Sequence, residues 1–430
     1  MQTVSQLAAL PTVHQAFQWF HLQEPQLRRW HCEIASIPAP SFGEATRAAW
    51  LCAKFAALGL EDAHVDACGN AIGWLRRRTA DTSRNTATDA TDKGPASAEI
   101  GPDDRPCILF SAHIDTVFSV EAMRTPVEQG AVLFAPSASD NAAGVVALLA
   151  LAAAMRAANL RTGVDILFAG NVGEEGEGNL RGMRHLFTES PFRQRITSAV
   201  VLDGAGHESI VTQGLGSRRF RVTITGPGGH SWSDAGTPNP VLALATALAE
   251  MQKLEVPRLP RTTWNVGRIE GGTVVNAIPE KVEALIDIRS TDPAQLLRLE
   301  VALYRAVEDA VLASDRDASQ QPSNKQPRRT ALEHSIAMVG ERPAARLPES
   351  ARLLAAIRAV DRHLGIRSEL RTASTDANVP LSLGVEAISL GSGGSGGGMH
   401  TREEWFDATN RDLGLRRILL LLLALAQVPE

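Results

Sequence analysis

Four short, continuously apolar segments constrain the fold of this 430-residue chain more than any other feature. They cover residues 108–112, 166–169, 199–202 and 387–390, and long helical patterns such as residues 142–158 lie between several of them. Strands that are apolar on both faces are typical of a parallel sheet with helices on each side. The segments therefore predict an α/β domain, with a mostly parallel sheet that helices cover on both faces.

The middle of the chain follows a different pattern. Apolar and polar residues alternate over residues 220–225 and again over 282–289, and helical stretches near 241–253 and 294–312 accompany them. Alternation with a period of two gives a strand one apolar and one solvated face, as in an antiparallel sheet. We therefore predict that residues 214–342 form a separate, inserted α+β domain with two helices on one face of a small sheet.

The α/β domain is then made of two parts of the chain, residues 1–213 and residues 343–430. Two polar segments interrupt this organisation, residues 79–104 and 314–329, and both contain few large apolar residues. Such segments bury too little surface to offset the entropy lost on ordering. We predict that both are mobile loop insertions.

Composition argues against several classes of function. The net charge of −5 shows no basic surplus, so we expect neither a nucleic-acid nor a membrane partner. The four cysteines form no C-x-x-C pair and are too sparse for a disulfide scaffold, which favours reduced thiols and a cytoplasmic protein. We find no signal-peptide pattern at the N-terminus, and the apolar run 418–426 is far shorter than the ~20 residues of a spanning helix.

Histidine, aspartate and glutamate residues lie next to the predicted strands and the helix. Asp140 stands just before the helical pattern that begins near residue 142, and the others come after the predicted strands: His113, Asp115, Glu174, Glu175, Asp203 and His400. In open α/β sheets, ligands bind at the carboxyl ends of the strands. We therefore expect these side chains to converge at one edge of the sheet.

Histidine, aspartate and glutamate are the nitrogen and oxygen ligands that zinc takes in catalytic sites. Two imidazoles and three carboxylates suit two metal ions, with one carboxylate bridging them at about 3.5–4 Å. Of Glu174 and Glu175, one can bind metal while the other accepts a proton from water, and the residues alone leave the choice open. Asp115 can orient the imidazole of His113. Taken alone, each residue has an ordinary alternative: Asp140 could cap a helix, and Glu174 and Glu175 could lie in a solvated turn. Independent caps and turns would not be expected to meet at one edge of the sheet.

Several segments also resemble one known family, the dinuclear zinc exopeptidases and deacylases. That family includes carboxypeptidase G, peptidase T, succinyl-diaminopimelate desuccinylase and acetylornithine deacetylase. The resemblance covers nearly the whole chain except the two polar insertions. Its motifs are I-P-A-P-S-F-G-E (37–44), C-G-N (68–70), S-A-H-I-D-T-V (111–117), S-D-N-A-A-G (139–144), G-E-E-G-E-G (173–178) and M-H-T (399–401).

The resemblance implies a role for each candidate. Glu174 would be the general base and Asp115 would support His113. The implied cofactor is a pair of divalent ions, expected to be zinc, although cobalt and manganese suit the same ligands. One metal would be bound by His113 and Asp203, the other by Glu175 and His400, and Asp140 would bridge the two.

The inserted domain resembles the lid of the same family, which often forms a homodimer. The resemblance implies that His230 helps to hold the oxyanion, often across the subunit interface, and that Asn276 and Arg289 contact the substrate. A guanidinium suits a substrate carboxylate because it binds in a bidentate manner. The alternatives are a plain turn residue for His230 and an exposed strand residue for Arg289. The motifs are G-P-G-G-H-S (226–231), G-G-T-V-V-N-A-I-P-E (271–280) and D-I-R (287–289).

We predict a hydrolase that cleaves an amide bond in short peptides. In the family that the chain resembles, aspartate at the position of Asp203 is commoner in aminopeptidases and dipeptidases, and glutamate in carboxypeptidases and deacylases. Asp203 therefore favours a peptidase that reads a free N-terminus. The alternatives are an N-acyl amino acid deacylase and a non-catalytic binding protein on the same fold. The glycine-rich residues 391–398 are expected to let backbone amides approach the substrate.

Overall fold

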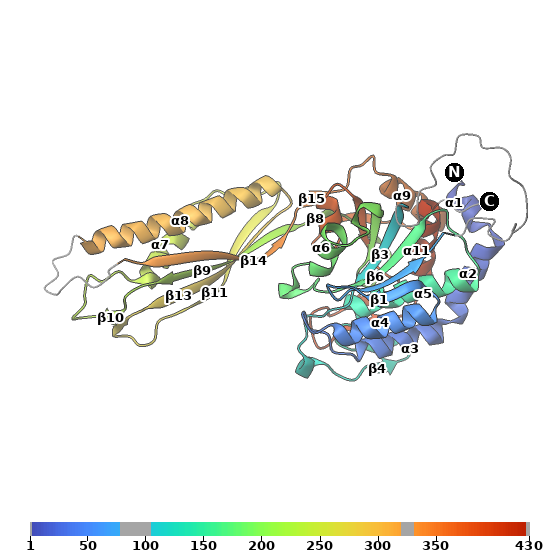
Figure 1. The fold of residues 1–430 in the computed structure, drawn as a ribbon, viewed down its shortest axis with the longest axis horizontal. Coiled ribbons are helices and arrows are strands. Elements are labelled where there is room, and N and C mark those ends of the chain that lie inside the picture. The colour runs from blue at the N-terminus through green and yellow to red at the C-terminus, as the bar shows by residue number, and fades with distance from the viewer. Residues whose placement is uncertain (1, 78–104, 320–330, 427–430) are drawn as a thin grey trace, which may run out of the picture. The chain divides into compact units, whose positions relative to one another are not determined.

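The computed structural model describes residues 2–77, 105–319 and 331–426 (Figure 1). It contains two compact units, Met1–Gln213 with Arg346–Glu430, and Gly214–Ala345. The second unit begins at residue 214, as the predicted inserted domain does, and ends at residue 345 instead of 342. The predicted insertion at residues 79–104 lies outside the described residues.

Four parallel strands form the centre of the sheet in the first unit. In spatial order they are β6 (Asp165–Asn171), β3 (Cys107–His113), β7 (Ile196–Leu202) and β17 (Glu386–Leu390). Each contains one of the apolar segments of the sequence. Every residue of β3 and of β6 is buried, so both faces of the sheet are covered at its centre.

Antiparallel strands flank this centre, and the sheet is therefore mixed. The pairing of β2 with β6 is antiparallel, and so is that of β8 with β17. The α/β class is confirmed, but the share of parallel strands is smaller than predicted, because exposed edge strands such as β1 carry no continuous apolar signature. The flanking strands are β1 (Glu61–Val65), β2 (Ala71–Leu75), β8 (Ser209–Gly214), β15 (Ala345–Arg346) and β16 (Glu369–Ala373).

Helices complete the first unit. Helix α5 (Ala143–Ala157) packs on β3 and β7, and it is buried from Ala143 to Met155. The stretch Ala138–Ala157 is long and apolar enough to cross a membrane, yet 94% of an apolar 18-residue window within it is buried in the protein, as expected for a core helix. The other helices are α1 (Val4–Ala8), α2 (Pro11–Leu22), α3 (Glu24–Ala35), α4 (Ala45–Ala57), α6 (Arg181–Thr188), α9 (Arg352–Leu364), α10 (Asn378–Ser382) and α11 (Arg411–Ala426).

A small second sheet joins two distant parts of the first unit. Its strand β19 (Trp405–Asp407) pairs with β5 (Val132–Phe134) on one side and with β18 (Ser395–Gly397) on the other, and β4 (Val127–Gln129) pairs with β5. This sheet brings the segment that contains His400 close to the turn that contains Asp140.

The second unit is an antiparallel sheet with two helices on one face. The strands are adjacent in the order β11 (Thr262–Gly271), β13 (Lys281–Ser290), β9 (Gly216–Thr225) and β14 (Glu333–Arg342). Burial alternates along β13, as the period-two pattern predicts. Its buried side chains share one core with α7 (Pro240–Gln252) and α8 (Pro293–Ser319).

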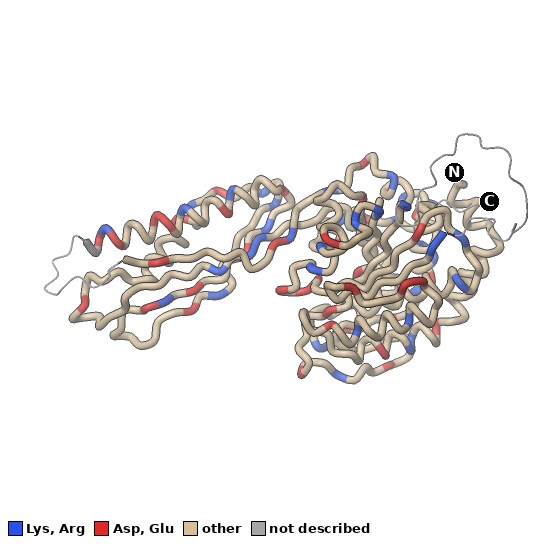
Figure 2. The backbone as a smooth tube through the Cα atoms, in the orientation of Figure 1, with Lys and Arg blue, Asp and Glu red and all other residues tan. Residues whose placement is uncertain are grey.

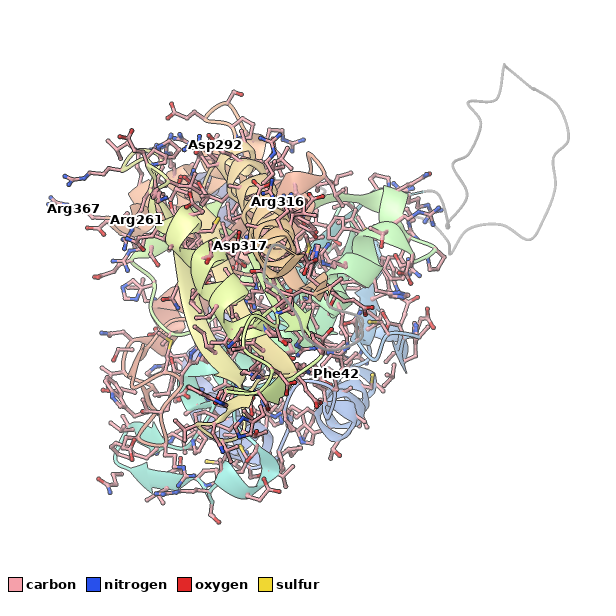
Figure 3. All side chains as sticks on the ribbon, turned by 90° about the vertical axis from the view of Figure 1, so that its left-hand side faces the viewer. Phe42, Arg261, Asp292, Arg316, Asp317 and Arg367 are labelled. Atoms are coloured by element: carbon pink, nitrogen blue, oxygen red, sulfur yellow. The ribbon has the colours of Figure 1, made fainter. Side chains whose placement is uncertain are left out.

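Helix α8 corrects one prediction. The helix continues to Ser319, so the first six residues of the predicted loop 314–329 are helical, and residues 320–329 lie outside the described residues. Arginine and acidic residues are interspersed along this helix (Figure 2). This polar composition resembles that of a loop if the helical periodicity is ignored. Asp292, labelled in Figure 3, accepts a hydrogen bond from the amide of Ala294 at the start of the helix.

Candidate metal centre

The strand ends place the predicted ligands at one edge of the large sheet. His113 is the last residue of β3, Asp203 follows β7 directly, and Glu174 and Glu175 come just after β6. These three strands are parallel neighbours, so their carboxyl ends meet. His400 reaches the same place from the loop between β18 and β19.

Asp140 lies between the two imidazoles. Its Oδ1 is 2.9 Å from Nε2 of His113, and its Oδ2 is 3.1 Å from Nε2 of His400. A carboxylate whose two oxygens face two different nitrogen ligands has the arrangement of a bridging ligand. One ligand atom from each of His113, Asp140 and Glu175 lies within 4.8 Å of the others.

Two further contacts extend this group. Oδ1 of Asp203 is 3.8 Å from Nε2 of His113, and Oε1 of Glu175 is 3.2 Å from Nε2 of His400. Each imidazole thus has one carboxylate of its own and shares Asp140 with the other. The donor atoms are all nitrogen or carboxylate oxygen, and their clustered negative charge favours divalent cations, so the residues fit a two-metal site.

The electrostatics of the group reflect the same crowding. Burial acts to raise the pKa of Asp140, but hydrogen bonds from His113 and His400 hold it below its usual value. Burial raises the pKa of Glu175, and His113 opposes that rise. The hydrogen bond to Asp140 raises the pKa of His400 to about 9.

Asp115 does more than the sequence suggests. Its Oδ1 is 3.4 Å from Nδ1 of His113, in keeping with the predicted orienting role. The same carboxylate accepts hydrogen bonds from the amide of Glu174 at 3.0 Å and from the amide of Glu175 at 2.9 Å. Ser41 donates to it as well, at 2.9 Å. Asp115 therefore fixes one imidazole and both neighbouring glutamates at once.

The N-terminal motif lies beside the same loop. Glu44 binds Arg181 through both carboxylate oxygens and accepts the amide of Gly173 at 3.1 Å, which holds the turn before Glu174. Between Ser41 and Glu44, the Phe42 side chain is 68% exposed, and the guanidinium of Arg181 lies 4.7 Å from its ring centre (Figure 3).

Two buried residues that the sequence analysis did not single out hold the turn of Asp140. Asn141 donates to the carbonyl of Leu202 at 2.8 Å and accepts the amide of Gly204 at 3.1 Å, so it fixes the backbone on both sides of Asp203. Glu404 accepts three backbone amides from the same turn. Burial raises the pKa of Glu404 to about 7. The sequence signals for these residues are their positions: Asn141 lies within the S-D-N-A-A-G motif, and Glu404 comes three residues after M-H-T.

The predicted lid residues occupy two different places in the second unit. His230, on β10 (Gly229–His230), pairs with Ala277 of β12 (Ala277–Ile278), and the carbonyl of Asn276 accepts the amide of Ser231 at 3.0 Å. Arg289, on β13, forms an ion pair with Asp287 at 2.6 Å. The structure therefore brings His230 and Asn276 together but not Arg289.

The ladder between β9 and β13 shows how far apart these residues are. It pairs Thr225 with Lys281 near the His230 end and Ser217 with Arg289 at the other end. Eight residues at about 3.4 Å each put Arg289 roughly 27 Å from that end. Within one chain, His230 and Arg289 cannot both touch one small substrate.

Imidazoles and carboxylates gathered at the strand ends of an α/β sheet suit the binding of catalytic metal ions, as in metal-dependent hydrolases. Residues 109–424 match peptidase family M20/M25/M40, and the chain belongs to that family. The family predicted from the sequence motifs is thereby confirmed.

Individual relatives agree with this placement. A probable carboxypeptidase of Aspergillus flavus is 28% identical over 212 residues, which are 45% of this chain and 50% of the relative, so the match spans half the length of that relative. The crystal structure of aminopeptidase PepT from Bacillus cereus has a TM-score of 0.69 at 18% identity and covers 94% of this chain and 99% of its own. The YxeP protein of Bacillus subtilis, described as a dinuclear metal-binding peptidase, has a TM-score of 0.62 at 14% identity, over 94% of this chain and 99% of its own. At these identities the two structures establish the fold.

Proposed function

We propose that this chain is a hydrolase that cleaves an amide bond in short peptides at a two-metal centre. The observation that carries the proposal is the position of Asp140, with one oxygen toward His113 and the other toward His400. Membership of a peptidase family supports it. The contact distances favour the ligand pairs His113 with Asp203 and His400 with Glu175.

The same contacts favour a division of labour between the two glutamates. Glu175 belongs to the ligand group with His113 and Asp140, and its Oε1 lies 3.2 Å from Nε2 of His400. We assign Glu174 as the general base that takes a proton from the attacking water and passes it to the leaving amine. Bound divalent ions, of which zinc is our choice, supply the Lewis acidity that polarises the scissile carbonyl and the water.

The local contacts of His230 fix which of its ring nitrogens can donate a hydrogen bond. Its Nδ1 accepts the amides of Trp232 at 3.1 Å and Ser233 at 3.4 Å, so the proton of the neutral ring resides on Nε2. A donor with a fixed tautomer suits the oxyanion of a tetrahedral intermediate. Asp234 accepts the amide of His230 at 2.8 Å and steadies the turn.

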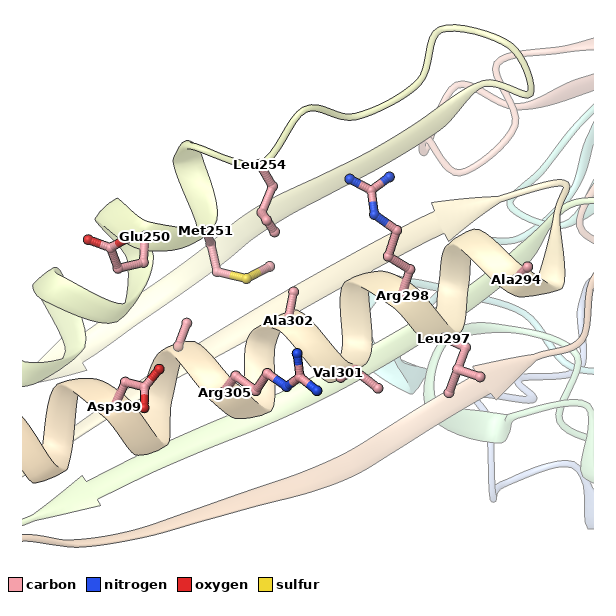
Figure 4. A pocket seen from close by; sticks show the side chains of 11 residues that line it. Glu250, Met251, Leu254, Ala294, Leu297, Arg298, Val301, Ala302, Arg305 and Asp309 are labelled. Atoms are coloured by element: carbon pink, nitrogen blue, oxygen red, sulfur yellow. The ribbon is translucent and has the colours of Figure 1, made fainter.

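The separation of His230 and Arg289 supports a homodimer. If Arg289 binds the substrate carboxylate and His230 binds the oxyanion, the two residues must come from different subunits, because eight residues of β13, roughly 27 Å, separate Arg289 from the strand end near His230. The second unit offers a surface for a second copy of this chain. On α8, Leu297, Val301 and Tyr304 are exposed at helical spacing. Leu297 and Val301 line a groove of about 600 Å³ between α7 and α8 (Figure 4).

For the substrate, we favour a peptide of two or three residues with a free N-terminus. Asp203 and the likeness to an aminopeptidase structure support this choice. The main rival is an N-acyl amino acid deacylase, and the relatives named as probable carboxypeptidases keep a C-terminal specificity open. The four cysteines are free thiols, which fits the cytoplasmic location that we propose.

A substrate panel with metal analysis tests these proposals. The purified protein should contain two metal ions per chain, lose them and its activity to a chelator, and regain activity with zinc. A dipeptide or tripeptide should be cleaved faster than its N-acetylated form; the opposite order would select the deacylase. Active protein with one metal per chain would reject the dinuclear centre. Protein that binds metal but cleaves nothing on the panel would favour the binding-protein alternative.

A further inference from the structure

Glu404 holds the turn that carries Asp140. Its side chain is fully buried, with 0% exposure. One carboxylate oxygen accepts the amides of Ser139 and Asp140, each at 2.7 Å, and the other accepts the amide of Ser137 at 2.9 Å. Three charge-assisted hydrogen bonds to one short backbone segment are a strong restraint.

This turn needs an external restraint because its backbone is irregular. Ser137 has φ = 69°, in the left-handed region, and neither Asp140 (φ −118°, ψ 90°) nor Asn141 (φ −135°, ψ 39°) is helical. Buried amides in such a turn lack the partners that a regular helix would provide. Glu404, 264 residues away along the chain from Asp140, provides them.

Glu404 also connects the two halves of the proposed metal centre. It follows His400 by four residues, and its own backbone carbonyl accepts the amide of Ala135 at 3.1 Å. The position of His400 is therefore mechanically linked to that of Asp140, and these two residues face each other at 3.1 Å.

Both carboxylate oxygens of Glu404 accept backbone amides, so Glu404 is not a sixth metal ligand and its role differs from that of the five proposed ligands. Arg47, also buried, balances the local charge, and it donates to Oγ of Ser137 at 3.1 Å and to the carbonyl of Ile114 at 3.0 Å. A carboxylate engaged in this way can orient a ligand but is not itself aimed at a metal.

We propose that Glu404 is a positioning residue that sets the Asp140 carboxylate between His113 and His400 and thereby determines how tightly both metal ions bind. This inference rests on the proposed two-metal centre. Because Asp140 would bridge, the loss of Glu404 should weaken both sites together and not one alone.

Three variants separate positioning from a general effect on folding. Glu404→Gln leaves one acceptor oxygen, and its NH₂ group must face one of the three amides, so at least one hydrogen bond is lost. Glu404→Asp keeps the charge on a shorter side chain. Glu403→Gln is the matched control, because Glu403 is exposed and adjacent. We expect Glu404→Gln to lower the affinity for zinc by roughly 10–100-fold, the usual cost of losing an outer-sphere partner, and Glu403→Gln to leave it unchanged.

The measurement is zinc titration of the metal-free full chain against a chromophoric chelator, with the absorption spectrum of the cobalt-loaded protein as a second readout. Weaker binding at both sites and an altered cobalt spectrum, with an unfolding temperature of the metal-free variant close to that of wild type, support the proposal. Wild-type affinity and spectrum in Glu404→Gln overturn it, even if that variant is less stable. If Glu404→Gln does not fold, Glu404→Asp decides by the same criteria. If the wild-type chain binds no zinc, the proposed function fails as well, whereas wild-type binding of two ions with an unaffected variant rejects this inference alone.

Discussion

Replacing Asp115 with asparagine should slow catalysis without emptying the metal centre. The carboxylate serves the amides of Glu174 and Glu175 with separate oxygens, while Ser41 and His113 add further contacts. Asparagine offers one oxygen, so its NH₂ group must face one of the two glutamate amides. A buried amide left without an acceptor costs about 1–3 kcal/mol. If that energy is lost from the positioning of the general base, kcat falls by roughly 5–150-fold.

The assay is steady-state hydrolysis of the best substrate from the panel, with metal content measured on the same sample. Ser41→Ala is the graded control, because it removes one neutral donor, worth about 0.5–1.5 kcal/mol, and both glutamate amides keep their acceptors. We therefore expect kcat to decrease from wild type to Ser41→Ala to Asp115→Asn. Turnover by Asp115→Asn within twofold of wild type would refute the idea that Asp115 holds the glutamates. A larger decrease in kcat for Ser41→Ala than for Asp115→Asn would also refute this idea.

Three further predictions test other parts of the molecule. Glu174→Gln should retain both metals and lose about 10²–10⁴-fold in turnover, and loss of metal instead would mean that Glu174 and Glu175 have exchanged roles. Burial, together with the charge of Arg411, lowers the pKa of His31 to about 3. Between pH 6.5 and 3 the imidazole therefore gains a proton only in the unfolded chain, and the free energy of unfolding falls as the pH falls. At pH 5 the loss is about 2 kcal/mol, and a His31→Gln variant should lack that part of the pH dependence in denaturant titrations. Mixing inactive His230→Ala and Glu174→Gln chains should restore about one quarter of the wild-type activity, because half of freely exchanging dimers are mixed and each has one intact site; a fully active monomer by light scattering would exclude the shared site.

Several features of the protein were predictable because they depend on local sequence. The central strands are continuously apolar since both of their faces are covered, and the strands of the second unit alternate since only one face is. Once the order of strand and helix predicted parallel neighbours, the residues after β3, β6 and β7 had to meet at one edge. His113, Glu175 and Asp203 are therefore visible in the sequence as candidates.

Other features depend on contacts between distant residues, which local patterns do not encode. Glu403 and Glu404 are neighbours of the same type, yet one is exposed and the other binds three amides of a turn 264 residues away. The edge strands of the large sheet carry too little burial to reveal their direction, and α8 runs into a segment whose polar composition resembles a loop.

Whether a feature could be predicted from the sequence depends on whether short segments or contacts between distant segments determine it. The sequence by itself determined which residues end strands, which chemistry they bring and to which family the motifs belong, because strand periodicity and residue type are properties of short segments. Only the tertiary structure decided that Asp140 turns one oxygen to each imidazole, that Asp115 and Glu404 hold the backbone around the centre, and that Arg289 lies at the end of the β9–β13 ladder far from His230. Those facts are set by register and by buried hydrogen bonds between segments far apart in the chain, where each buried polar group must find a partner.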